Sequence, residues 1–99
     1  MNIRALQSRA PHSPALEKYA EAGKLLANDP SCGPQDARDE LVRILYEWTA
    51  RLKIPTLGTY SVKESHVAKI VAGSRGSSMK TNPIVLTDGE IADIVRARL

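Results

Sequence analysis

The side chains that could do chemistry in this 99-residue chain are few and lie in separate segments. Two histidines, His12 and His66, and a single cysteine, Cys32, share no local motif. A zinc or iron site needs three or four converging His, Cys or carboxylate ligands, so we expect no metal site within the chain. Ser77 and Ser78 lack a histidine in a recognisable elbow or triad context, so no catalytic residue is assigned.

The glycine- and serine-rich stretch AGSRGSSMK, residues 72–80, is the only segment with the composition of a phosphate-binding loop. It follows an expected helix instead of a strand, and it lacks both the G-x-G-x-x-G spacing and the P-loop spacing. The residues themselves therefore predict no cofactor site in the isolated chain.

Charge and hydropathy exclude further classes of function. The net charge is +3 and the pI near 9.2, but the basic residues are interleaved with acids, and none of the four aromatic residues lies in a basic cluster. Nucleic-acid binding is therefore not expected. No apolar run approaches the roughly 18 residues of a membrane span, and no secretory signal is recognisable, so we expect a cytoplasmic protein without membrane insertion.

Segments with the three- and four-residue apolar spacing of amphipathic helices must position these residues. The first helix is predicted to follow Ser13 as N-cap and Pro14 at the first helical position, and to end near Asn28. The second opens at Pro34, with acids in its first turns, and is stopped by Pro55. The sequence NDPSCGP between them collects turn-forming residues and predicts a loop.

The two remaining helices each begin with the S/T-x-x-E pattern of a capping box, in which two side chains satisfy backbone donors of the first turn. Ser61 and Glu64 form the pattern before one helix, and Thr87 and Glu90 form it before the last. No strand pattern, repeat or domain boundary is visible. We therefore expect an all-α fold, a compact bundle of four to five helices in a single domain over residues 1–99, with residues 1–12 as an irregular N-terminal arm.

The second helix has the broadest apolar stripe in the sequence. The stripe comprises Ala37, Leu41, Ile44, Leu45, Trp48 and Leu52, widened by Val42 and Tyr46. Such a stripe is typical of the central helix of a bundle, and the functional alternative is a surface for a partner helix.

Residues 54–99 resemble the C-terminal end of the iron-containing alcohol dehydrogenase family, which includes lactaldehyde reductase and maleylacetate reductase. Three motifs match the family in order and spacing: Lys53-Ile54-Pro55, Asn82-Pro83, and the run from Leu86 to Glu90. The segment SPALEKYAEAGKLL is also similar to a family segment, so the resemblance extends from Pro11 onward.

The resemblance implies a parent enzyme with two domains, a nucleotide-binding domain and a helical domain like that of dehydroquinate synthase, with NAD(P) and iron or zinc between them. It implies that this chain corresponds to the last part of the helical domain, downstream of the metal ligands. His12 fits a non-ligand position of the family. Ser78 stands where some members have a cysteine near the nicotinamide, so the resemblance implies a substrate-cleft loop formed by Gly76, Ser77, Ser78, Met79, Lys80 and Asn82.

Three functions are compatible with this sequence. The favoured one is a truncated or stand-alone helical domain without independent catalysis that acts through binding. The second is a split-enzyme subunit that completes an NAD(P)-dependent oxidoreductase with a separate nucleotide-binding chain. The third is an unrelated helical interaction module that forms a homo-oligomer through the Leu41–Leu52 helix. The expected partner is thus a protein, either another chain or a second copy.

Overall fold

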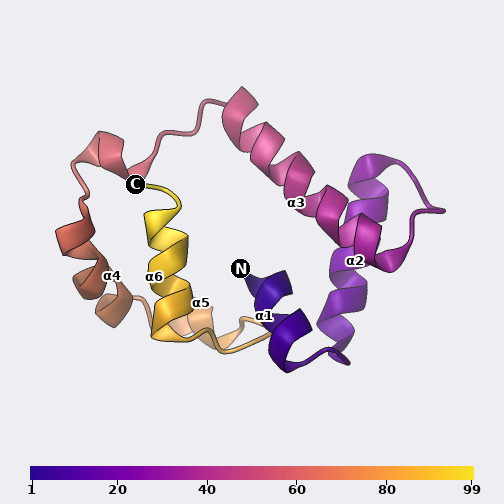
Figure 1. The fold of residues 1–99 in the computed structure, drawn as a ribbon, viewed down its shortest axis with the longest axis horizontal. Coiled ribbons are helices and arrows are strands. Elements are labelled where there is room, and N and C mark those ends of the chain that lie inside the picture. Colours follow the sequence, from indigo (N-terminus) through magenta and orange to yellow (C-terminus); the bar gives the residue numbers. More distant parts are fainter. The chain divides into compact units, whose positions relative to one another are not determined.

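The computed structural model describes residues 1–99 and contains α-helices and short 3-10 helices but no strand (Figure 1). The all-α class expected from the sequence is confirmed, with six α-helices where four to five were expected. In chain order the elements are α1 (Asn2–Arg9), α2 (Pro14–Ala27), α3 (Pro34–Arg51), η1 (Leu57–Tyr60), η2 (Glu64–His66), α4 (Val67–Gly73), α5 (Ser77–Lys80) and α6 (Asp88–Arg96).

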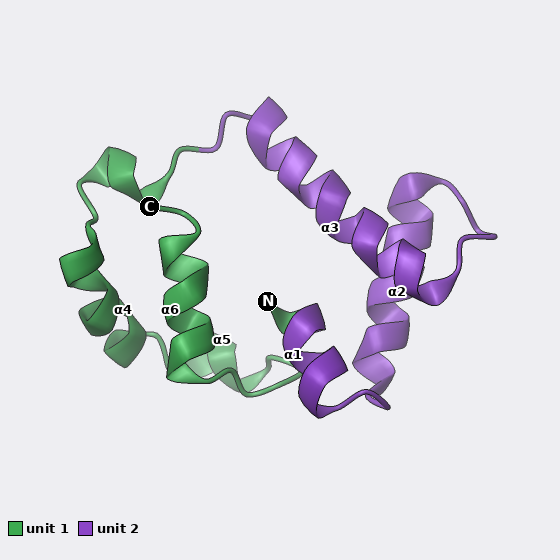
Figure 2. Cartoon of the chain, in the orientation of Figure 1, with its two compact units in different colours: residues 1–2, 55–99 green, residues 3–54 purple.

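The chain divides into two compact units, a division that the sequence pattern did not indicate (Figure 2). Unit 2 comprises Ile3–Ile54 and contains α2, α3 and nearly all of α1. Unit 1 comprises Met1–Asn2 and Pro55–Leu99 and contains the remaining helices.

The N-terminal segment is helical, which corrects the expectation of an irregular arm over residues 1–12. α1 runs from Asn2 to Arg9 and buries Ala5 and Leu6 almost completely. An isolated helix of eight residues is marginal in water, so tertiary burial of these two side chains must stabilise it. The one cap-type residue at its start, Asn2, bonds through its side chain to Asn82.

α2 and α3 form a helical hairpin in unit 2. The start of α2 is the one expected, because the Ser13 hydroxyl accepts a hydrogen bond from the Ala15 N–H at 3.3 Å. At the crossing the two backbones approach so closely that a Cβ on Gly23 would lie 1.9 Å from the carbonyl oxygen of Ala37. Glycine is therefore required at this contact, and Ala37 is fully buried against it.

α3 ends at Arg51, four residues before Pro55, through backbone geometry that the sequence did not reveal. The Lys53 N–H bonds to the Ala50 carbonyl at 3.0 Å and the Ile54 N–H to the Thr49 carbonyl at 3.1 Å. These are the two bonds of a Schellman motif, and Lys53 occupies its left-handed position with φ of 51°. Pro55 therefore follows the stop and does not cause it.

Unit 1 is built around the contact between α4 and α6. The capping box expected at the start of α6 is confirmed: the Thr87 hydroxyl accepts from the Glu90 N–H at 3.2 Å, and the Glu90 carboxylate accepts from the Thr87 N–H at 2.8 Å. The buried apolar side chains of this unit are Val67, Val71, Leu86, Ile91, Ala92 and Val95.

The capping box expected at Ser61 and Glu64 was wrong. Ser61 ends η1 in the left-handed conformation, with φ of 63°, and makes no cap for the following helix. The backbone N–H of Lys63 is instead satisfied by Nδ1 of His66 at 3.1 Å. His66 thus has a structural role as a hydrogen-bond acceptor at a helix start.

Candidate functional site

The residues predicted to line a substrate cleft lie in and around α5, the short helix of unit 1. Gly76 precedes the helix, and Ser77, Ser78, Met79 and Lys80 form it. Met79 is half-buried, whereas both serines and Lys80 are exposed. Neither serine hydroxyl is hydrogen-bonded to a histidine or carboxylate, the partners that activate a serine nucleophile.

Asn82, the last predicted cleft residue, has a structural partner. Its side-chain amide donates to Asn2 Oδ1 at 3.0 Å and to the Ile84 carbonyl at 2.7 Å, and its Oδ1 accepts from Asn2 at 2.7 Å. Both polar ends of the Asn82 side chain are therefore used within unit 1. These hydrogen bonds fix the Asn82-Pro83 turn and connect it to Asn2, near the N-terminus.

The histidines and the cysteine remain separate in the structure. No group of three or more His, Cys, Asp or Glu side chains is arranged to hold a metal ion, so the residues present do not fit the iron or zinc that the family resemblance implies. His12 is exposed in the turn before α2. Partial burial, together with the carboxylates of Asp29 and Asp36, raises the pKa of the Cys32 thiol, a shift that disfavours the nucleophilic thiolate.

The feature that stands out from the rest of the molecule is an exposed apolar surface on α3. Along the predicted stripe, Ala37, Leu41 and Ile44 are buried, but Leu45 is 47% exposed. Trp48 is 42% exposed and Leu52 is 71% exposed. We define the α3 apolar face as Val42, Leu45, Tyr46, Trp48 and Leu52, all of which are exposed.

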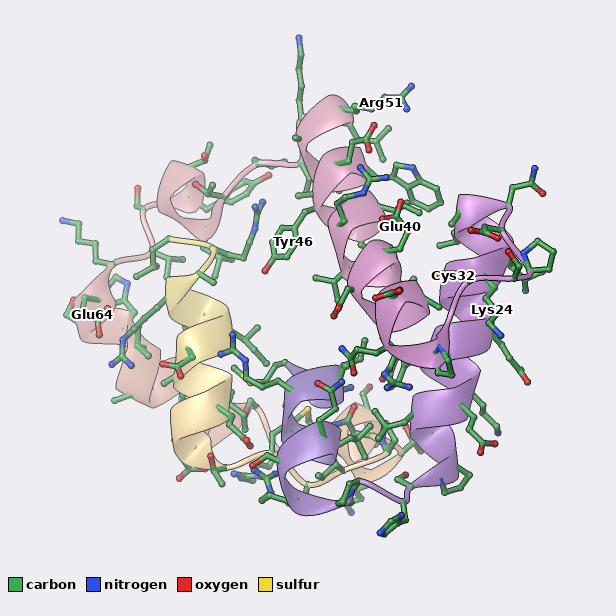
Figure 3. The ribbon with its side chains drawn as sticks, turned by 45° about the vertical axis from the view of Figure 1, so that its right-hand side comes forward. Lys24, Cys32, Glu40, Tyr46, Arg51 and Glu64 are labelled. Carbon is green, nitrogen blue, oxygen red and sulfur yellow. The ribbon has the colours of Figure 1, made fainter.

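The arrangement of the helices explains where burial stops. α2 crosses α3 at Gly23 and Ala37, near the start of α3, and the rest of α3 runs away from α2 (Figure 2). In Figure 3, Tyr46 projects from α3 on the side away from α2, and Arg51 lies at the far end of the helix. The apolar spacing of the sequence thus continues beyond the part of α3 that α2 covers.

Charged groups along α3 divide into a paired centre and two ends of opposite sign. Arg43 bonds to the Glu40 carboxylate at 2.9 Å and to that of Glu47 at 3.0 Å. The hydrogen bond from Arg43 lowers the pKa of Glu40, and its bonds to both carboxylates raise the pKa of Arg43. The N-terminal turns carry three acids and one arginine over residues 36–40, and the C-terminal end carries Arg51 and Lys53 without an acid.

Comparison of the chain with models of known protein families, with curated proteins and with solved structures finds no match. Among the helices, none has the length and apolar character that a bilayer span would require.

The sequence identified every residue of the α3 apolar face but assigned the stripe chiefly to a bundle core. A signal for the exposed surface was present, because the stripe of the second helix is wider than that of the shorter helix preceding it. The part of α3 that α2 buries depends on the point where the two helices cross, at Gly23. Local periodicity carries no information on that crossing.

Proposed function

We propose that this chain is a protein-binding helical domain, which acts by burying the α3 apolar face against another polypeptide and has no turnover of its own. The observation that carries the proposal is the end of burial after Ile44, while the apolar spacing continues through Leu45, Trp48 and Leu52. Contiguous exposed apolar side chains of this kind mark interaction surfaces.

The residue types of the face favour a protein as its ligand. Burying a leucine or a residue of similar size contributes about 1.5–3 kcal/mol, so several such side chains can offset the cost of association. Tryptophan and tyrosine are the residues most enriched among those that carry binding energy at interfaces. Trp48 and Tyr46 supply both types on one helix.

The resemblance to the C-terminal helical part of iron-containing alcohol dehydrogenases is included in the proposal. Its support is the ordered succession of the Ile54-Pro55, Asn82-Pro83 and Leu86–Glu90 motifs in the sequence. In that family a helical domain works together with a nucleotide-binding domain. The second candidate function, a subunit that completes an NAD(P)-dependent oxidoreductase with a separate chain, rests on the same motifs.

Photocrosslinking at two matched tyrosines tests the binding function. Tyr46 lies on the α3 apolar face and is 67% exposed, whereas Tyr60 lies in η1 and is 68% exposed. Each is replaced in turn by benzoylphenylalanine in cells that produce the chain, and the products are identified by mass spectrometry. We expect a crosslinked polypeptide from position 46 and none from position 60. Equal yields at the two positions, or no product from position 46, would contradict the proposal.

A turnover assay tests the second half of the proposal. The purified chain is incubated with Fe²⁺ or Zn²⁺, NAD⁺ or NADP⁺ and a small alcohol, and reduction of the cofactor is followed by absorbance. We expect no reduction above the protein-free control. Metal-dependent reduction by the chain alone would refute the assignment, and reduction only after a nucleotide-binding chain is added would favour the split enzyme.

A further inference from the structure

We infer that the occupant of the α3 apolar face is a second copy of this chain, whose α3 packs antiparallel against the first. The inference rests on the proposed function and names the partner. It is carried by three features of α3: the spacing of its exposed apolar residues, the asymmetry of its charges, and the register in which both are satisfied together.

Three exposed apolar side chains of α3, together with the half-buried Thr49, have the spacing of a seam at which two helices pair. Val42, Leu45, Thr49 and Leu52 follow one another at steps of three, four and three residues, which is the a/d pattern of a heptad repeat. Thr49 does not interrupt the seam, because its hydroxyl already donates to the Leu45 carbonyl at 2.8 Å. The threonine methyl is thus available for packing without an unsatisfied polar group.

The charges of α3 select the antiparallel direction. Arg43 in the middle is paired with Glu40 and Glu47 of its own helix, which leaves an acidic N-terminal end and a basic C-terminal end. A second α3 in parallel would bring acids against acids and cations against cations. An antiparallel copy places each acidic end beside a basic end, and it also opposes the two helix dipoles favourably.

One register satisfies both the seam and the charges. In an antiparallel heptad pair an a position of one helix packs beside a d position of the other, and e positions face each other. Placing Val42 beside Leu52 of the second copy also places Leu45 beside Thr49 of that copy. The same register places Asp39 beside the C-terminal end of α3 of the second copy, on both sides of the two-fold axis, where the flexible side chain of Lys53 follows the helix. It also brings the two Tyr46 side chains together.

The paired charges are available for this contact. Asp39 is exposed on α3, and its carboxylate accepts only from Gln35 of its own helix, at 3.0 Å. Lys53 is exposed immediately after the helix, and its long flexible side chain extends beyond the Schellman turn. Each two-fold pair of copies therefore gains two symmetric Asp39–Lys53 contacts at the rim of an apolar seam.

Sedimentation velocity across a dilution series, with reductant to keep Cys32 unpaired, measures the association. We expect a reversible dimer of twice the 10.8 kDa chain mass. Leu45→Glu places a carboxylate in the seam and should weaken the dimer at least about a hundredfold. Leu25→Glu is the matched control, because Leu25 is 80% exposed on α2, outside the seam, and it should leave the dissociation constant unchanged. Circular dichroism of both variants checks that their helix content matches that of the wild type.

A charge-swap mixing experiment tests direction and register. Asp39→Lys and Lys53→Asp alone should each weaken self-association about tenfold, because each replaces two attractive contacts by two repulsive ones. Aspartate tolerates the left-handed conformation of position 53. An equimolar mixture of the two variants should recover wild-type affinity to within about threefold, because the heterodimer restores both contacts. A parallel dimer would show no such recovery.

A monomer at all concentrations, a dimer insensitive to Leu45→Glu, or absence of recovery in the mixture would each overturn the inference. Crosslinking from position 46 distinguishes the failure of this inference from the failure of the proposed function. A monomeric chain that crosslinks from position 46 to a different polypeptide contradicts the second copy but not a protein-binding face. A monomeric chain that gives no crosslink from position 46 contradicts both.

Discussion

Replacing Gly23 by alanine tests the close crossing of α2 and α3, which determines how much of α3 is covered. The added Cβ would lie 1.9 Å from the Ala37 carbonyl oxygen and 2.6 Å from its carbonyl carbon. Both are backbone atoms of a helix, so they cannot move away by a rotamer change as the end of a flexible side chain could. Relief requires the two helices to separate by about 1 Å along the whole contact, which loosens the packing of neighbouring buried side chains.

Two opposing effects set the magnitude. Alanine in a helix interior is favoured over glycine by about 0.5–1 kcal/mol, whereas overpacking of a close contact typically costs about 1–3 kcal/mol. The contact here is with rigid backbone, so the cost is at the upper end of that range. We expect Gly23→Ala to lower the free energy of unfolding by about 2 kcal/mol.

The assay is urea denaturation followed by far-UV circular dichroism at a fixed protein concentration. Gly33→Ala is the control in the same unit, because a Cβ there meets nothing nearer than a flexible Asp36 carboxylate oxygen at 4.0 Å. Gly33 is the N-cap of α3, where alanine is less favourable than glycine, so Gly33→Ala should cost no more than about 1 kcal/mol. A Gly23→Ala variant as stable as the wild type, or more stable, would refute the close crossing.

Three further predictions concern helix ends and charges. Thr87→Ala removes the confirmed capping box of α6 and should cost about 1 kcal/mol of unfolding free energy in urea denaturation, whereas Thr87→Ser should restore most of it. Lys53→Gly, made in the Leu45→Glu background so that the Asp39–Lys53 contacts between copies play no part, relieves the left-handed conformation at the end of α3 and should raise the thermal midpoint slightly; a fall would show that the Schellman turn is not formed in solution. The lowered pKa of Glu40 means that its contribution to stability is present above the unfolded-state pKa and is lost as pH falls through the folded-state pKa, below the ordinary value of 4.5. Arg43→Gln should therefore reduce the loss of stability on acidification, and an unchanged acid profile would contradict the Arg43–Glu40 pairing.

Start signals that lie in adjacent residues were predictable from the sequence. Ser13 and Pro14 begin α2, Pro34 begins α3, and Thr87 with Glu90 begins α6, because each signal is a local hydrogen bond or a fixed φ angle. The predicted role of residues 76–82 in a substrate cleft remains a prediction. The structure adds that Asn82 is engaged with Asn2.

Features that depend on distant contacts or on unusual backbone angles were not predictable. The end of α3 at Lys53 and the turn at Ser61 use positive φ without glycine, so the usual glycine marker is missing. The end of α2 near Asn28 was predicted, although Asn28 also has positive φ. Ser61 and Glu64 match the capping-box pattern, but the left-handed Ser61 belongs to the preceding turn. α1 is stabilised by the burial of Ala5 and Leu6. No local sequence pattern predicts that burial.

The emission of Trp48, the single tryptophan of the chain, tests most directly whether the α3 apolar face becomes buried on association. Trp48 lies on that face and is partly exposed in the single chain. We predict that its emission maximum shifts to longer wavelength, and that iodide quenches it more strongly, as the wild-type protein is diluted, while Leu45→Glu gives the long-wavelength, quenchable emission at every concentration. Emission and quenching that are independent of concentration and identical in the two proteins would contradict the account.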